Sequence, residues 1–290
     1  MNFNGLGVAL ITPFNHDLTI DYGSLGKIVD KLMADNVDYI VVLGTTAETP
    51  TLMADERQEV LRFVAERVGG RLPLVAGMGG NNTVLLTTRL RQMDFTGYNA
   101  ILSVVPFYNK PSQEGLYAHF AAVAEASPLP VILYNIPGRT GINMTADTTL
   151  RLAQDFENIA GIKEASDRPD QWKKIIENHG DNFAVISGDD ASALNMIELG
   201  GNGVISVAAN AFPADFAGMI HLALDGKPVE ARTINNRFLP LYPLMFRDGN
   251  PAGIKAVLSL MNRIENRLRL PLVPASESTI AEIQKFLAKL

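Results

Sequence analysis

The sequence predicts an α/β fold of the (β/α)8 barrel class (a TIM barrel), followed by a small C-terminal helical domain. Short apolar runs recur along the chain, and a helical pattern follows each of them. Most of these runs are apolar on both faces, as expected for parallel strands that are covered on both sides. Eight such units in about 220 residues match the size and rhythm of a barrel.

The predicted strands set the order of the barrel. They cover residues 8–11, 39–43, 74–76, 100–105, 131–134, 159–163, 183–187 and 203–207. A doubly wound sheet is the alternative layout. A glycine-rich fingerprint after the first strand would favour it, but the sequence there reads Thr12-Pro13-Phe14-Asn15.

Amphipathic helices are predicted between the strands. In the first of them, Leu25, Ile28, Val29 and Leu32 fall on one face, as in a helix that packs on a sheet. The next covers residues 55–68 and ends at a glycine pair, a common helix terminator.

Strand patterns end near residue 226. Three helical patterns follow, over residues 229–246, 252–264 and 277–290, and Pro240 and Pro243 should kink or split the first of them. We therefore expect a barrel over residues 1–225 and a helical domain over residues 226–290.

The composition is that of an ordinary globular protein. Of the 290 residues, 47% are hydrophobic and 19% are charged, and the net charge is −6. This charge argues against a nucleic-acid partner. The chain has no cysteine, no apolar stretch of the roughly 20 residues that span a bilayer, and no secretory pattern at its start. We expect a cytoplasmic protein with no membrane contact.

In a barrel of this class, chemistry is placed at the C-terminal ends of the strands. Lys163 closes the predicted strand 159–163, where an ammonium ion has little structural use. Burial disfavours the charged form of an amine, and a neutral amine attacks carbonyl carbons. Lys163 is therefore a candidate for imine formation with a keto acid. The ordinary alternative is a surface lysine that extends its charge into water.

Other strand ends carry groups that such chemistry needs. Tyr134 is a candidate acid or base, and a hydrogen-bonded chain through Thr45 would link it to Tyr108. Thr46 could hold a substrate carboxylate, and Arg139 could bind a second one bidentately. Each residue taken alone is more simply a packing or capping residue, so the hypothesis rests on their joint appearance.

Two further patterns suggest structural roles. Asp189-Asp190 resembles an acid pair, but a helical pattern starts directly after it, which favours helix capping by one carboxylate. The four histidines are scattered without the spacing of metal ligands, which argues against a metal-dependent aldolase.

At these strand ends the sequence resembles the dihydrodipicolinate synthase / N-acetylneuraminate lyase family. The match runs through the whole predicted barrel and continues more loosely to residues 269–274. The segments that carry it are Gly44-Thr45-Thr46-Ala47-Glu48, Tyr134-Asn135-Ile136-Pro137-Gly138-Arg139-Thr140-Gly141, Gly161-Ile162-Lys163-Glu164-Ala165 and Ser187-Gly188-Asp189-Asp190-Ala191-Ser192-Ala193-Leu194.

The resemblance implies a lyase that uses no metal and no organic cofactor. Lys163 would form a covalent imine with pyruvate, and Thr45, Tyr108 and Tyr134 would relay protons. Tyr108 would reach into the active site of a neighbouring subunit, so the resemblance also implies a homotetramer built as a dimer of dimers.

The substrate-binding residues are likewise implied by the resemblance. Thr46 would bind the pyruvate carboxylate, Arg139 the carboxylate of aspartate semialdehyde, and the backbone at Gly188 and Ile205 would line the pocket. The product would be a cyclic hydroxy-tetrahydrodipicolinate on the route to lysine and diaminopimelate. A sialic-acid lyase would have a small or apolar residue at position 139.

The chain departs from the family pattern in two places. Ala47 stands where the turn often has glycine, which would strain the backbone if φ were positive there. Lysine-inhibited relatives place a glutamate at the position of Leu85, and without a carboxylate we expect weak or absent inhibition by lysine. The positions of this remodelled effector site are Thr49, Ala54, Arg57, Asn81, Leu85 and Phe107.

Three functions remain open on the sequence alone. The first is the condensation of pyruvate with aspartate semialdehyde. The second is a related enzyme acting on sialic acid or a 2-keto-3-deoxy sugar acid. The third is a barrel that binds a keto acid without catalysis. Trapping with borohydride separates the third from the others, and a comparison of the aldehyde and sialic-acid substrates separates the first two.

Overall fold

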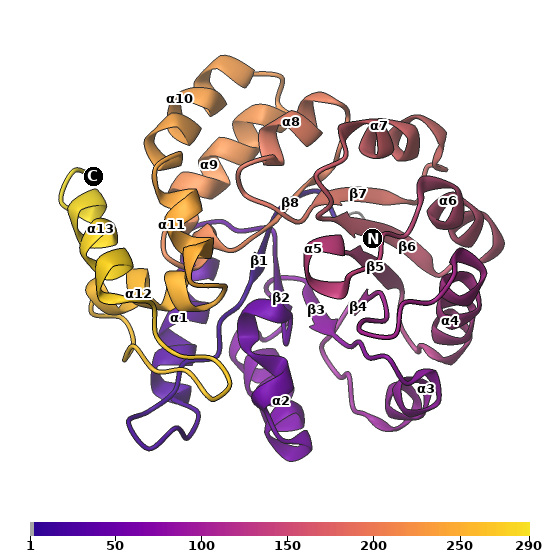
Figure 1. Ribbon diagram of the computed structural model, residues 1–290, viewed down its shortest axis with the longest axis horizontal. Coiled ribbons are helices and arrows are strands. Elements are labelled where there is room, and N and C mark those ends of the chain that lie inside the picture. Colours follow the sequence, from indigo (N-terminus) through magenta and orange to yellow (C-terminus); the bar gives the residue numbers. More distant parts are fainter. Residues whose placement is uncertain (1–2) are drawn as a thin grey trace.

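The computed structural model describes residues 3–290 and shows a closed barrel of eight parallel strands in the order β1 to β8. The strands form the centre of the molecule and the helices surround them (Figure 1). The predicted fold class is confirmed. The strands are β1 Gly5–Ala9, β2 Tyr39–Val42, β3 Leu74–Gly77, β4 Ala100–Val104, β5 Val131–Asn135, β6 Ile159–Glu164, β7 Ala184–Ser187 and β8 Gly203–Ser206.

Strand β1 differs most from the prediction of residues 8–11. It begins earlier, at Gly5, and ends at Ala9, because the N–H of Ile11 is bonded to the side chain of Asn210 (3.1 Å) rather than to a strand. Each of the other seven strands differs from its predicted range by one residue at one end.

The barrel closes through two glycines. Gly5 of β1 lies opposite Gly203 of β8, and both have positive φ, 93° and 145°. A Cβ atom on Gly203 would lie 2.0 Å from the carbonyl oxygen of Gly5, so only glycine permits this approach of the first and last strands.

Helices follow the strands and pack their apolar faces on the outside of the barrel. They are α1 Tyr22–Ala34, α2 Ala54–Val68, α3 Thr83–Gln92, α4 Gln113–Ala126, α5 Pro137–Thr140, α6 Ala146–Asp155, α7 Pro169–Asn178, α8 Ala193–Glu198 and α9 Pro213–Leu224. Short 3₁₀ turns cover η1 Thr45–Ala47, η2 Thr49–Thr51 and η3 Ala208–Asn210. As expected, α2 ends at Gly69, which has φ 57°.

The interior of the barrel is a packed core of its own. Buried side chains from several strands fill it, including Val41, Val75, Ile132, Tyr134 and Ile205. A polar group that enters this interior is therefore surrounded by apolar side chains and shielded from water.

Four helices follow the barrel where three helical patterns were predicted. They are α10 Pro228–Phe238, α11 Leu241–Arg247, α12 Ala252–Leu260 and α13 Glu277–Leu287. Pro240 stands between α10 and α11 and splits the first pattern, whereas Pro243 is accommodated inside α11. Helix α12 ends before the predicted residue 264, and Asn262 just beyond it has φ 57°.

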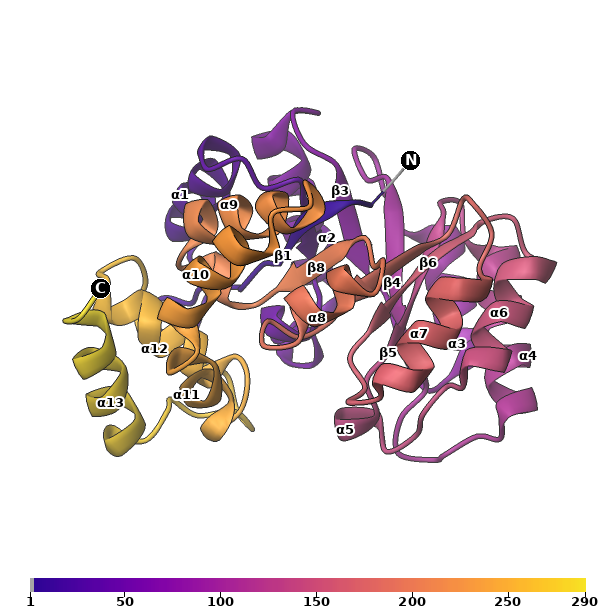
Figure 2. The ribbon, with the colours of Figure 1, turned by 90° about the horizontal axis from the view of Figure 1, so that it is seen from above.

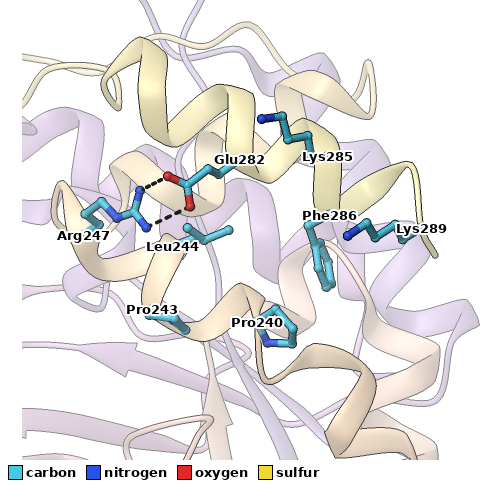
Figure 3. A pocket seen from close by; sticks show the side chains of 8 residues that line it. All are labelled: Pro240, Pro243, Leu244, Arg247, Glu282, Lys285, Phe286 and Lys289. Atoms are coloured by element: carbon cyan, nitrogen blue, oxygen red, sulfur yellow. Dashed lines mark hydrogen bonds and ion pairs between the residues drawn. The ribbon is translucent and has the colours of Figure 1, made fainter.

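The last helices gather at one end of the molecule (Figure 2). Arg247 of α11 binds Glu282 of α13 through two hydrogen bonds of 2.7 and 3.1 Å, at the edge of a hollow of about 400 Å³ (Figure 3). The division of the chain at residue 225 stays a prediction. Across residues 3–290, no helix is both long and apolar enough to cross a membrane.

Candidate functional site

Lys163 lies inside the barrel. It sits on β6 directly beside Tyr134 of β5, with which it is in register, and each side chain is only 5% exposed. The Lys163 Nζ atom is 4.4 Å from the centre of the Tyr134 ring. Within the described part of the chain, this amine makes no hydrogen bond or ion pair with another side chain. It is an unpaired amine on a largely buried side chain, next to a phenol ring.

Gly188 leaves the space beside this amine. It follows β7, and a Cβ atom there would lie 3.0 Å from Cε of Lys163 and 2.6 Å from the Cβ atom of Ala165. On the next strand, Ile205 is fully buried in the same interior core as Tyr134. Tyr134 and Gly188 thus lie beside Lys163, and Ile205 packs in the same core as Tyr134.

The turn after β2 carries Thr45 and Thr46. Thr46 is buried, and its hydroxyl oxygen accepts a hydrogen bond of 3.0 Å from the side-chain amide of Asn250. Ala47 does not have positive φ, so the strain considered for that position is absent. The left-handed residue is the next one, Glu48, with φ 56°.

Glu48 is held by the C-terminal helices. Its carboxylate forms a fully buried ion pair with Lys255 of α12 and accepts a hydrogen bond of 3.0 Å from the N–H of Arg269. Lys255 also donates to the carbonyl oxygen of Arg267 (2.9 Å) and lies 4.1 Å from the ring centre of Phe14. The turn that carries Thr45 and Thr46 is therefore anchored from outside the barrel.

Sequence reasoning missed Asn250 and Lys255. A signal was present for Lys255, because helix α12 is apolar on every side and this lysine is its only charged residue. A lone charge in such a helix must be paired when it is buried. No comparable signal existed for Asn250, which lies in a loop between α11 and α12.

Arg139 lies on the short helix α5 after β5. Its side chain is exposed, and its Nη2 atom is 3.5 Å from the carbonyl oxygen of Asn250. Asn250 thus contacts both Thr46 and Arg139, the two residues predicted to bind carboxylates.

Tyr108 lies apart from the other predicted proton-transfer groups. It is 84% exposed and has φ 74°, an unusual backbone conformation for a bulky residue. Among residues 3–290, no hydrogen bond joins the hydroxyls of Thr45, Tyr108 and Tyr134, so the predicted hydrogen-bonded chain is not formed.

A cavity of about 650 Å³ opens beside the turn after β2. It is lined by Thr45, Tyr134 and Arg139, and also by most of the predicted effector positions, namely Thr49, Arg57, Asn81, Leu85 and Phe107. Ala54 is exposed but does not line it, and neither do Thr46, Lys163, Gly188 and Ile205.

The two aspartates after β7 have separate structural roles. Asp189 accepts a hydrogen bond from the N–H of Ser192 (3.0 Å), the residue before α8. The helix begins two residues later than the predicted 191, its N-cap is Ser192, and no side chain caps it, so the predicted capping of α8 by a carboxylate is not formed. Asp190 is buried and accepts from the N–H groups of Val207 and Ala208, both at 3.0 Å. In residues 3–290, no group of three or more His, Cys, Asp or Glu side chains is arranged to hold a metal ion.

Comparison with known proteins agrees with this geometry. A sequence model described as the dihydrodipicolinate synthetase family matches residues 2–290. A 4-hydroxy-tetrahydrodipicolinate synthase of Parabacteroides distasonis is 52% identical over 290 residues, which is 100% of this chain and 98% of the relative. A protein of the same name from Phocaeicola vulgatus is 52% identical over 286 residues, covering 99% of this chain and 96% of the relative.

Solved structures give the same result. The dihydrodipicolinate synthase of Thermotoga maritima superposes with a TM-score of 0.96 and 37% identity, covering 100% of this chain and 99% of that one. The identity and coverage extend over barrel and C-terminal helices alike. On these grounds the chain belongs to the dihydrodipicolinate synthetase family.

Proposed function

We propose that this chain condenses pyruvate with L-aspartate 4-semialdehyde to give 4-hydroxy-tetrahydrodipicolinate, in lysine and diaminopimelate biosynthesis. The observation that carries the proposal is the Lys163 amine, buried beside Tyr134 with no carboxylate partner. An amine in this position, unpaired and inside the barrel, can act as the nucleophile toward a carbonyl carbon. Relatives at about 52% identity that carry this enzyme name support the substrate pair.

The reaction begins with attack of the Lys163 amine on the keto carbon of pyruvate. Water leaves and a protonated imine forms, which withdraws electrons from the neighbouring methyl group. Loss of a methyl proton gives an enamine, whose carbon attacks the aldehyde carbon of the semialdehyde. The aldehyde oxygen takes up a proton as the carbon–carbon bond forms. The amino group of the semialdehyde then displaces Lys163 from the imine carbon, which closes the ring and frees the enzyme.

Tyr134 is the proton carrier nearest to the reacting atoms in this proposal, because its ring lies 4.4 Å from the Lys163 amine. Thr46 binds the pyruvate carboxylate. Its hydroxyl oxygen already accepts the Asn250 amide hydrogen, so its own proton is available to donate to an anion. The backbone at Gly188 and Ile205 lines the pocket.

Tyr108 completes the relay from a neighbouring subunit. Its exposed position and its absence from the hydrogen bonding around Tyr134 support a role across an interface. We accordingly propose a homotetramer built as a dimer of dimers, working in the cytoplasm, with no cofactor other than the imine on Lys163. We also propose that the barrel over residues 1–225 carries the chemistry and that residues 226–290 form the helical domain.

Arg139 determines the aldehyde substrate in this proposal. An exposed guanidinium at the cavity suits a short aldehyde with a carboxylate, whereas a long polyol chain would gain nothing from it. A coupled assay should show turnover with aspartate semialdehyde and none with sialic acid. Arg139→Ala should raise the KM for the semialdehyde by about tenfold or more, through loss of a charge-assisted hydrogen bond, and change that for pyruvate little.

The matched control is Arg151→Ala, which removes an arginine from α6 that pairs with Glu114 on the surface. It should leave both KM values unchanged. If Arg139→Ala used the semialdehyde as well as the wild type does, the assignment of the second substrate would be wrong.

A further inference from the structure

The cavity beside the turn after β2 is strongly cationic. Its four charged lining residues are Glu48, Arg57, Arg89 and Arg139. The one acidic residue, Glu48, is fully buried in its ion pair with Lys255 and presents no free charge to the cavity. Three guanidinium groups therefore face this space without an available carboxylate on its walls.

Two of these arginines are separate from the candidate active site. Arg57 lies on α2 and Arg89 on α3, both at the bottom of the view in Figure 1. Both side chains are half-buried, and within residues 3–290 neither guanidinium forms a hydrogen bond or an ion pair. The third arginine, Arg139, belongs with Asn250 and the substrate residues.

The arrangement of Arg57 and Arg89 is electrostatically unfavourable when no anion is bound. The Nε atom of Arg57 is buried and has no hydrogen-bond partner. Burial, together with the nearby charge of Arg89, lowers the pKa of the Arg57 guanidinium. Two neighbouring like charges that are partly desolvated and lack a counter-charge destabilise the protein, and a bound anion removes that cost.

The surroundings favour an organic anion over a bare inorganic one. Leu85 and Phe107 line the same cavity and are 46% and 40% exposed, so they offer apolar surface next to the guanidinium groups. Asn81 also lines it and donates to the carbonyl oxygen of Phe107 (3.2 Å), which fixes the loop at this point. A ligand with a carboxylate and a short hydrocarbon body matches these walls.

We propose that Arg57 and Arg89 bind the carboxylate of a small organic anion, at a site distinct from the Lys163 amine. The proposal does not depend on the reaction assigned to Lys163. It assigns this chain an anion-binding site where its lysine-inhibited relatives are expected to hold lysine, and the two guanidinium charges repel the ammonium groups of that effector.

Titration calorimetry with the full-length wild-type protein tests the proposal. Succinate is the probe, because it carries carboxylates and has no keto or aldehyde group to form an imine. Phosphate and the uncharged analogue 1,4-butanediol are compared with it at constant ionic strength. We expect succinate to bind more tightly than phosphate, and butanediol not to bind.

Variants locate the site. Arg57→Gln and Arg89→Gln should each weaken succinate binding by about tenfold or more, since each removes a charge-assisted contact. Arg91→Gln is the matched control, because it removes an exposed arginine from the same helix as Arg89 without touching the cavity. It should leave the affinity unchanged, and so should Arg139→Gln.

Several results would overturn the proposal. They are no binding of succinate by the wild type, an equal loss in Arg91→Gln, or a loss confined to Arg139→Gln, which would place the anion in the substrate site. Circular dichroism shows whether each variant is folded. If Arg57→Gln does not fold, Arg89→Gln decides alone.

Discussion

The side-chain amide of Asn250 donates a hydrogen bond of 3.0 Å to the hydroxyl of Thr46, which lies 204 residues away in the sequence. The carbonyl oxygen of the same Asn250 is 3.5 Å from Nη2 of Arg139. One residue from the loop before α12 thus contacts two of the proposed carboxylate-binding residues. The C-terminal helices take part in arranging the substrate site.

Replacing Asn250 with alanine should therefore raise the KM for pyruvate more than it lowers kcat. Without the amide donor, the Thr46 hydroxyl is free to rotate and is less often aligned with the carboxylate. A lost hydrogen bond of this kind is worth about 1 kcal/mol, or roughly fivefold in KM. Steady-state kinetics on Asn250→Ala checks this, with Asn178→Ala, at an exposed position on α7, as the control outside the site. Unchanged KM values would contradict the role given to Asn250.

Breaking the buried ion pair of Lys255 and Glu48 on one side should destabilise the protein strongly. Lys255→Met leaves the Glu48 carboxylate buried without its partner, which costs about 3–5 kcal/mol. Urea denaturation at fixed protein concentration measures the free energy of unfolding. The double variant Lys255→Met/Glu48→Gln should recover part of the loss.

A surface pair provides the control for this prediction. Arg247→Met breaks the ion pair with Glu282, in which the two side chains are 42% and 49% exposed, and should lower the free energy of unfolding far less than Lys255→Met does. If Lys255→Met and Arg247→Met lowered the free energy of unfolding equally, burial of the Lys255–Glu48 pair would not make it more important for stability than a surface pair.

His119 should make the protein sensitive to acid. It is 4% exposed, and burial lowers its pKa from 6.5 to about 4. Its Nδ1 atom is 2.8 Å from the Thr83 hydroxyl. The buried Nε2 atom has no hydrogen-bond partner, so a proton on it would bring an uncompensated charge into the interior. Between pH 6.5 and 4 the unfolded chain binds a proton here that the folded chain does not. The stabilising contribution is complete above pH 6.5 and is lost as the pH falls toward 4.

The loss amounts to about 3 kcal/mol, because the pKa is lowered from 6.5 to about 4. Denaturation measured from pH 7 to pH 4 should show a shallower decline for His119→Gln than for the wild type. His16→Gln, at an exposed position, should follow the wild type. Parallel pH profiles for all three proteins would rule out His119 as the acid-sensitive group.

Inhibition by L-lysine should be weak or absent. The two ammonium groups of lysine need carboxylate partners. Leu85 offers none, and Arg57 and Arg89 repel these ammonium groups. Activity assays over a range of lysine concentrations check this. Half-inhibition at submillimolar lysine would mean that the effector site is intact despite its altered residues.

The sequence allowed the barrel and the residues around Lys163 to be predicted, because both depend on short segments. An apolar run covered on both faces marks a strand, and the end of the strand marks the position of a side chain such as Tyr134. Strand ends were accurate to one residue for seven strands. The exception was β1, where a side chain from Asn210 takes the place of a strand partner.

Contacts between distant segments could not be predicted in this way. The bonds of Asn250 to Thr46 and of Lys255 to Glu48 join residues more than 200 positions apart, and no periodicity encodes them. The sequence also does not show that Tyr108 lies apart from Tyr134. Its partners depend on how the loop after β4 leaves the barrel, where the backbone of Tyr108 itself has positive φ.

Lys163 is the nucleophile in the proposed reaction, and reduction with borohydride in the presence of pyruvate can show this. Reduction fixes an imine as a stable adduct, and peptide mass spectrometry then identifies the modified lysine. We expect one adduct per chain, on the peptide that contains Lys163, and none in Lys163→Ala. No adduct in the wild type, or an adduct on the other buried lysine, Lys255, would contradict it.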